Sequence, residues 1–235
     1  MPTTPHVPWT TDIGERLRER QWLKFLGTTA WIWLFFIGYF HLLRNPMGPV
    51  FEMPWTPVDD WVAFQPVWLI PYLSLWVYVG IAPGLQRGFL PLLAYGAWAG
   101  ALCVTGLLLF MFFPTRVPPV TIDPGGFPGF AMLQGIDAAG NACPSMHVAI
   151  AIFTCCWLEH ILRRARAPRG LRLLNVAWFL AIAYSTMATR QHVFLDALAG
   201  AVMGALFAWA SLRWRPADVP RTAHTAPAVA IMDRQ

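Results

Sequence analysis

The sequence is poor in charge. Only 12% of its 235 residues are Asp, Glu, Lys or Arg, whereas a soluble globular domain carries about 25%. Hydrophobic residues make up 57% of the chain, so the composition excludes an ordinary cytosolic enzyme and a disordered protein. The formal net charge of +5 is spread too thinly to indicate a nucleic-acid partner, and none is expected.

Cysteine is also scarce, and its spacing fits neither a disulfide framework nor a metal site. Of the four cysteines, Cys103, Cys155 and Cys156 fall within apolar stretches, and Cys143 stands outside them. The sequence has no acidic cluster that could hold magnesium. We therefore expect no metal ion and no other cofactor.

Long apolar stretches are abundant instead. A helix that crosses a bilayer needs about 20 mostly apolar residues, and six stretches meet this requirement: 25–43, 66–83, 89–113, 146–162, 173–189 and 193–212. The alternation typical of barrel strands is absent. Any one stretch could be a buried helix of a soluble core, but six leave too little polar chain to cover such a core. The sequence predicts an all-α bundle of six transmembrane helices.

The basic residues indicate an orientation, because cytoplasmic loops are enriched in Lys and Arg. If both termini are cytoplasmic, all but three of the 17 basic residues lie inside, and the exceptions are Arg44, Arg116 and Arg190. We expect a multi-pass protein, of a bacterial inner membrane, with an interfacial segment (1–21), a transmembrane domain (22–212) and a disordered cytoplasmic tail (213–235). Residues 12–24 are typical of a short interfacial helix, with Asp12 and Glu15 at capping-box spacing.

Two of the stretches contain a Gly-x-x-x-Gly pattern, Gly96 to Gly100 and Gly200 to Gly204. Small residues at this spacing let helices approach closely. Packing within the chain is the preferred interpretation, and contact between copies in a homo-oligomer is the alternative.

Polar residues gather where four helix ends meet on the outer side. His192 and Asp196 are four residues apart, so they share one face of a helix. A carboxylate inside a membrane span is costly and marks a candidate functional site. Asp196 would hold one imidazole nitrogen of His192 and leave the other free as a nucleophile. A purely structural His–Asp pair is the alternative.

A second outer segment runs from Asn141 to His147. Pro144 suits the first turn of a helix, where Ser145 and its neighbours would present free N–H groups to an anion. His147 lies in the same turn, where it can give or take a proton, although a helix cap with a bystander histidine is the alternative. Arg116 and Arg190 add charge that matches phosphate oxygens. Together these residues indicate a phosphoryl-transfer site.

These segments resemble the signature motifs of the type 2 phosphatidic acid phosphatase (PAP2) superfamily over about residues 66–212. Residues 144–147 are similar to the family's usual second motif, Pro-Ser-Gly-His. Residues 185–196 are similar to its usual third motif, in which Ser-Arg is followed after five residues by His and after three more by Asp. The resemblance implies six spans and a site at one membrane face. It implies that His192 forms a phosphohistidine beside Asp196 and that His147 is the general acid. The residues it implies for gripping the phosphate are Ser145, Arg116 and Arg190.

The motifs depart from the usual pattern in several places. Leu109 stands where the first motif has Lys, Arg116 is separated from Pro118 by a valine, Thr186 replaces an Arg, and Met146 replaces Gly. This variant is similar to the inositolphosphorylceramide-synthase and sphingomyelin-synthase branch, whose members transfer phospho-head-groups between lipids. Water as acceptor would make the protein a phosphatase, and an alcohol would make it a transferase.

Three further possibilities remain open at this point. The loop from Pro114 to Cys143 is a lid over the head group or a passive connector. The chain could be an intramembrane serine protease that uses Ser145 or Ser185 with His192. It could also be a non-catalytic lipid-binding or transport protein on the same fold.

Overall fold

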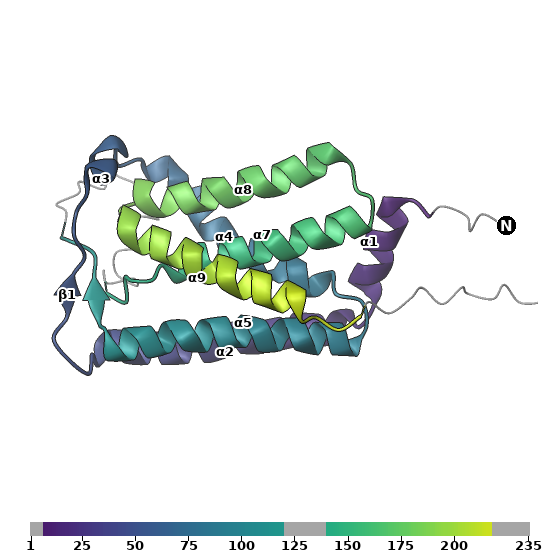
Figure 1. The fold of residues 1–235 in the computed structure, drawn as a ribbon, viewed down its shortest axis with the longest axis horizontal. Helices are drawn as coiled ribbons and strands as arrows, with labels where there is room; N and C mark the ends of the chain where they lie inside the picture. Colours follow the sequence, from purple (N-terminus) through teal and green to yellow (C-terminus); the bar gives the residue numbers. More distant parts are fainter. Residues whose placement is uncertain (1–6, 120–139, 218–235) are drawn as a thin grey trace, which may run out of the picture.

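The structure, a computed structural model, describes residues 7–119 and 140–217 and is almost entirely helical (Figure 1). Its elements in chain order are α1 (Trp9–Arg18), α2 (Gln21–Arg44), β1 (Phe51–Glu52), α3 (Pro57–Trp61), η1 (Pro66–Trp68), α4 (Leu69–Gly84), α5 (Phe89–Phe112), β2 (Thr115–Arg116), α7 (Met146–Arg164), α8 (Arg169–Ala188) and α9 (Phe194–Arg213). The middle of the predicted lid or connector, most of the predicted tail and the first six residues lie outside the described residues.

Six of the helices are long and apolar enough to cross a membrane: α2, η1 with α4, α5, α7, α8 and α9. The predicted all-α bundle of six spans is confirmed, and the chain is a multi-pass membrane protein. The observed ends agree with the predicted ones to within a few residues, except that α2 and α8 each begin four residues earlier. The long helices lie roughly parallel, and the short elements gather at the two ends of the bundle (Figure 1).

The predicted interfacial helix has different bounds from those expected. The observed helix is α1, which ends at Arg18. Arg20 has a left-handed backbone with φ of 52°, and this turn separates α1 from α2. Asp12 does not cap the helix, because its carboxylate accepts hydrogen bonds from Arg16 at 2.7 Å and Arg87 at 2.9 Å. The Lys24 ammonium donates to the carbonyl of Arg16. These bonds tie α1 across one end of the bundle, called the α1 end below (Figure 1).

The other end, called the site end below, carries the short elements β1, β2 and α3 (Figure 1). Strands β1 and β2 pair in parallel, and Arg116 also bridges to Gly140. The Cys143 N–H donates to Thr115 Oγ1 at 2.8 Å. The end of α5 is therefore fastened to the segment that leads into α7.

Helix α7 is the most buried of the six spans, and α9 packs directly on it. A Cβ atom added to Gly200 would lie 2.3 Å from the Ser145 carbonyl oxygen, and one added to Gly204 would lie 2.2 Å from that of Ala149. Both distances are far inside van der Waals contact, so these glycines let the two backbones touch. The second Gly-x-x-x-Gly pattern thus packs within the chain, as preferred above. A homo-oligomer stays a prediction.

The close contact between α7 and α9 leads to a prediction about thermal stability. Gly204→Ala should lower the melting temperature in detergent, because the added methyl group meets backbone that cannot move aside and overpacking of this kind costs about 1–3 kcal/mol. Gly80→Ala is the matched control, since a Cβ there meets no atom within 4 Å among the described residues. Equal melting temperatures for the two variants would contradict the close α7–α9 contact.

Candidate active site

His192 and Asp196 lie where α8 gives way to α9. The Thr186 carbonyl accepts the N–H groups of Gln191 and His192, both at 3.0 Å, and so ends α8 in a tight loop. His192 Nδ1 lies 3.0 Å from Asp196 Oδ2. The predicted contact is present, but its geometry differs from that expected, because His192 precedes α9 and only Asp196 lies in its first turn. With an ionised carboxylate as acceptor, Nδ1 carries the proton and Nε2 keeps its lone pair.

His147 lies in the first turn of α7, and its ring is held by aromatic neighbours. The imidazole stacks on Tyr72 with centroids 4.3 Å apart and meets the Trp76 ring edge-on at 5.6 Å. The His147 and His192 ring centroids are 6.0 Å apart. His147 Nε2 is buried and has no hydrogen-bond partner among the residues that the structure describes. The structure thus brings the two imidazoles together although they are 45 residues apart in sequence.

Ser145 is the N-cap of α7, and its surroundings differ from the prediction. Pro144 precedes the cap and is not in the first turn. The Ser145 N–H is not free, because it donates to the Asp196 carbonyl at 2.9 Å. Its hydroxyl is fully buried and accepts from the Val148 N–H. The donors that face no partner within the helix are the N–H groups of Met146 and His147, as at any helix start.

Met146 occupies the place where the family motif usually has glycine. Its side chain packs against α5 at Gly106, where an added Cβ would lie 2.2 Å from the Met146 sulfur. The missing side chain of Gly106 therefore leaves the space that the Met146 side chain occupies.

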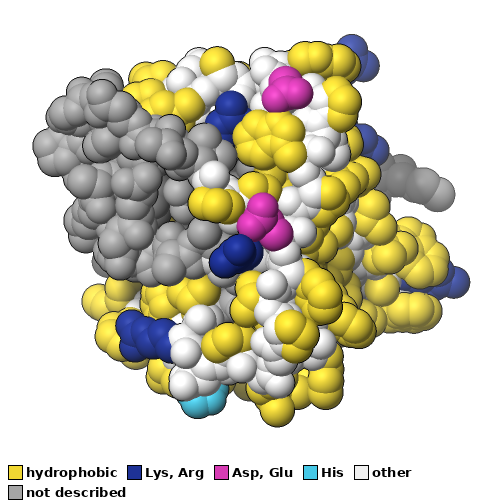
Figure 2. Space-filling view, turned by 90° about the vertical axis from the view of Figure 1, so that its left-hand side faces the viewer, with side chains coloured by type: hydrophobic (Ala, Val, Ile, Leu, Met, Phe, Trp, Pro, Cys, Tyr) yellow, Lys and Arg dark blue, Asp and Glu magenta, His cyan; other side chains and the backbone are white. Residues whose placement is uncertain are grey.

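Arg116 lies on the exposed surface of the site end. Its guanidinium pairs with Glu52 at 3.0 Å, and both side chains are about half exposed, at 54% and 45%. Basic and acidic side chains lie next to each other among hydrophobic ones on this face (Figure 2). An exposed ion pair is worth about 0–1 kcal/mol, so a phosphate could displace Glu52 at little cost. The structure shows no contact between Arg116 and either histidine in the described part of the chain.

Arg190 is held by the segment between α2 and α4. It has a left-handed backbone with φ of 59°, and its Nη1 donates to the Asp59 carbonyl at 3.1 Å. The guanidinium lies over the Trp55 ring, 4.8 Å from its centroid. Its Nε is buried without a hydrogen-bond partner in the described ranges, which leaves this donor unsatisfied by the protein there.

Asp59 is a residue of the site that sequence reasoning missed. Its carboxylate is buried and accepts from the Phe194 N–H at 2.7 Å, which caps the first turn of α9. The other carboxylate oxygen accepts from the Thr56 N–H and hydroxyl, forming a capping box on α3. The Thr-Pro-Val-Asp spacing at 56–59 is a recognisable helix start. Its link to α9, however, depends on the tertiary fold.

The described residues form no group of side chains that could bind a metal ion. Within residues 7–119 and 140–217, no three His, Cys, Asp or Glu side chains lie together in a way that could hold a metal ion. Cys143 lies close to Asp196, and burial together with that carboxylate raises the pKa of its thiol to about 11. The thiol is therefore neutral at physiological pH and a poor nucleophile.

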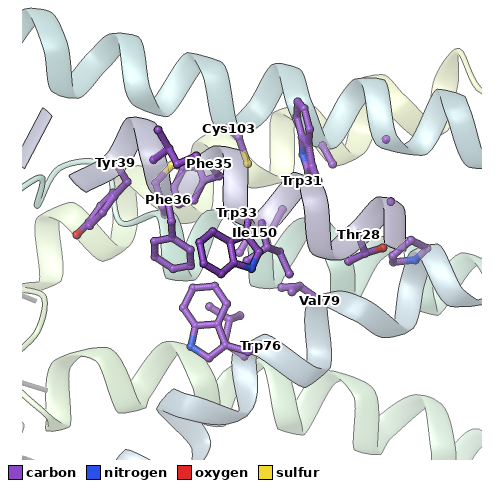
Figure 3. Close-up of a pocket in the computed structure, with 18 of the residues that line it drawn as sticks. Thr28, Trp31, Trp33, Phe35, Phe36, Tyr39, Trp76, Val79, Cys103 and Ile150 are labelled. Atoms are coloured by element: carbon purple, nitrogen blue, oxygen red, sulfur yellow. The ribbon is translucent and has the colours of Figure 1, made fainter. Parts of the chain in front are cut away.

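A large apolar groove leads away from the two histidines. It has a volume of about 1400 Å³ and lies between α2, α4, α5 and α7. Aromatic and aliphatic side chains form its walls, including Trp31, Phe35, Phe36, Trp76 and Val79 (Figure 3). His147, His192 and Asn141 line it at the site end, and Lys24 lines it at the α1 end. A hydrocarbon chain in this groove would place its polar head beside the imidazoles.

Comparison with protein families gives one finding. The PAP2 superfamily model matches residues 90–220, which contain α5, α7, α8 and α9. The match begins later than the predicted resemblance and leaves out α4. The chain matches no curated protein and no solved structure. Because the family model covers more than half of the chain, including the segments of Arg116, His147 and His192, the protein belongs to the PAP2 superfamily.

Proposed function

We propose that this protein transfers a phosphoryl or phospho-head-group from a membrane lipid through a phosphohistidine on His192. Membership of the PAP2 superfamily supports lipid-phosphatase-type activity in a membrane. The observation that carries the finer proposal is the 6.0 Å separation of the two imidazoles at one end of an apolar groove. One of these imidazoles is oriented by the buried Asp196.

In the first step His192 Nε2 attacks phosphorus. An N–P bond forms, the bond to the leaving oxygen breaks, and His147 gives its proton to that oxygen. The Asp196 carboxylate, 3.0 Å from Nδ1, stabilises the positive charge that develops on the His192 ring.

In the second step an acceptor hydroxyl attacks the phosphohistidine. His147, now neutral, takes the acceptor's proton, and the N–P bond breaks to restore His192. Water as acceptor gives a phosphatase and an alcohol gives a transferase. The replacements Thr186 and Met146 support the inositolphosphorylceramide-synthase and sphingomyelin-synthase-like branch, and therefore head-group transfer.

The charge on the phosphate is stabilised by the protein itself in this proposal, without a metal ion. Arg190 offers its unpartnered Nε, Arg116 can exchange Glu52 for phosphate, and the N–H groups of Met146 and His147, which have no acceptor within α7, add the positive end of the helix dipole. In this proposal Ser145 does not contact the phosphate: its hydroxyl caps α7 by accepting from the Val148 N–H, and its own N–H donates to the Asp196 carbonyl.

The experiment is an assay of the purified protein against a panel of lipid phosphates and phosphodiesters, with and without inositol and other alcohols. Release of inorganic phosphate identifies a phosphatase, and a new phosphodiester identifies a transferase. Binding without turnover would favour the alternative, a non-catalytic lipid-binding or transport protein. The protease alternative has little support, because the Ser185 hydroxyl donates to the Ile182 carbonyl within α8 and Ser145 caps α7.

For the orientation we propose cytoplasmic termini and an extracytoplasmic site in a bacterial inner membrane. The support is the distribution of basic residues. Arg87 lies in the connection between α4 and α5, and Arg163 and Arg172 lie in the adjoining ends of α7 and α8, all at the α1 end, whereas Arg116 and Arg190 lie at the site end. This asymmetry fits an α1 end that faces the cytoplasm.

Asp59 is a positioning residue in this proposal, and it makes a separate prediction. Asp59→Ala removes the cap on the first turn of α9, which carries Asp196, so kcat should fall about tenfold or more while KM changes little. The pH profile should also change, because Asp196 would hold His192 less firmly. Kinetic constants and the pH profile of the purified variants measure this.

The neighbouring Asp60 provides the control. Its carboxylate accepts from the Trp55 indole and makes no contact with α9 in the described structure, so Asp60→Ala should have a much smaller effect. If Asp59→Ala only lowers thermal stability and leaves the kinetics and the pH profile intact, Asp59 is merely structural.

A further inference from the structure

The groove is about as long as the hydrocarbon core of a bilayer is thick. Along α2 its lining runs from Leu23 to Asn45, which at about 1.5 Å per residue is about 33 Å. The hydrocarbon core of a bilayer is about 30 Å thick. Helix α4 contributes from Tyr72 to Pro83, and α5 contributes from Phe89 at the α1 end. The lining therefore runs from the imidazoles at the site end to Lys24 at the α1 end.

The chemistry of the lining changes along this length. At the site end it offers the two histidines, Asn141 and Arg44, whereas the middle is formed by side chains such as Trp31, Phe35 and Val79 (Figure 3). At the α1 end the Lys24 ammonium is already bound to the carbonyls of Arg16 and Gly84. One polar head at the site end and one long apolar body match this distribution.

The volume of the groove also indicates a ligand with a long apolar body. Pockets for compact small molecules measure roughly 300–1,000 Å³, and this groove measures about 1400 Å³. A diacyl lipid with its phosphate at His192 has tails that end near the midplane, about 15 Å deep. Such a lipid would leave the half of the groove beyond the midplane, toward Lys24, unfilled.

We propose that the substrate is a lipid phosphate with a single hydrocarbon chain that passes the bilayer midplane, as in a long polyprenyl phosphate. This inference rests on the proposed function for the reacting end and on the groove for the chain. Helix α2, which forms one wall throughout, lies outside the residues that match the superfamily. One wall of the groove therefore lies outside the residues shared with the superfamily, and the walls formed by α5 and α7 lie within them.

Two glycines allow the groove to be blocked without disturbing the histidines. Gly96 and Gly27 line it, and an added Cβ at either meets no atom within 4 Å in the described part of the chain. Gly96 lies 16 residues before the end of α5, about 24 Å from the site end. Gly96→Leu should therefore fill only the depth that a long chain reaches. Gly80→Leu is the control, because Gly80 also faces open space but does not line the groove.

The test compares farnesyl phosphate, undecaprenyl phosphate and dioleoyl phosphatidate in detergent micelles, measuring both turnover and binding. The wild type should prefer undecaprenyl phosphate in kcat/KM and in affinity. Gly96→Leu should lower the undecaprenyl-to-farnesyl ratio at least tenfold, and Gly80→Leu should keep it. A ratio that is the same in the wild type and Gly96→Leu, or a wild-type preference for phosphatidate, would overturn the proposal.

The two measurements also separate this inference from the proposed function. If the wild type binds undecaprenyl phosphate best and Gly96→Leu weakens that binding, but no probe is turned over, the groove assignment stands and the enzymatic proposal fails. If all three probes are turned over with the same chain-length profile in both proteins, the enzymatic proposal stands and the groove assignment fails.

Discussion

His192→Ala is expected to lower turnover of a lipid phosphate by on the order of 10⁴-fold or more, because the variant loses the atom that forms the N–P bond. Losses of this size follow removal of a nucleophile that works as a unit with its neighbours. Asp196 lies 3.0 Å from Nδ1, so Asp196→Asn should also be severely impaired, through loss of the required tautomer. Initial rates of the purified variants, checked for native melting behaviour, measure both effects.

A matched control is available on the same bundle. His160 lies at the opposite end of α7 and belongs to no part of the proposed site, so His160→Gln should keep activity close to that of the wild type. Full activity in His192→Ala would end the phosphohistidine proposal. Equal losses in His192→Ala and His160→Gln would indicate damage to the fold.

His147→Gln is expected to lower kcat/KM by about 10²–10⁴-fold on substrates with an alcohol leaving group, which is the usual contribution of a general acid. The loss should shrink to less than about tenfold on a nitrophenyl ester, because that leaving group departs without a proton. The comparison uses kcat/KM because this constant reports the first chemical step. Stopped assays with the two substrate types measure it.

The pattern of the two losses distinguishes the possible roles of His147. If His147 only packs against Tyr72 and Trp76, both substrates should lose activity equally. Such a result would remove His147 from the chemistry. His147→Asn, with its shorter side chain, serves as a second variant if the Gln variant does not fold.

Much of the fold could be predicted from the sequence because a bilayer imposes simple rules. Backbone groups in hydrocarbon must be satisfied within a helix, so apolar stretches of sufficient length could only be spanning helices. Asp196 was conspicuous for the same reason, since a carboxylate in a span needs a partner. Its contact with His192 was predicted from a spacing of four residues, although His192 precedes α9 and does not share a helical face with Asp196.

Other features depend on contacts between segments far apart in the chain. Asp59 caps α9 across 135 residues, and Arg190 lies on Trp55, so neither partnership could be found from local spacing. The partner of Met146 was equally hidden, because Gly106 is one of many glycines in apolar stretches. The Ser145 N–H was expected to be free, and only the fold shows that the Asp196 carbonyl accepts it.

The groove was the least predictable feature. The aromatic residues of α2 are typical of a lipid-facing helix, and the sequence alone cannot distinguish a face that meets bulk lipid from one that walls a cavity. Once α2 lies beside α4 and α5, Phe36 meets Trp76 with ring centroids 5.0 Å apart, and the same residues become walls of the groove.

The most direct measurement is to trap the intermediate. The protein would be mixed with a ³²P-labelled lipid phosphate in the presence of EDTA, quenched under alkaline conditions, and mapped by mass spectrometry. The account predicts an acid-labile phosphoryl group on His192, formed at least as fast as turnover and absent in His192→Ala. Turnover that proceeds without labelled protein, a label on Ser145 or Ser185, or complete loss of activity in EDTA would contradict it.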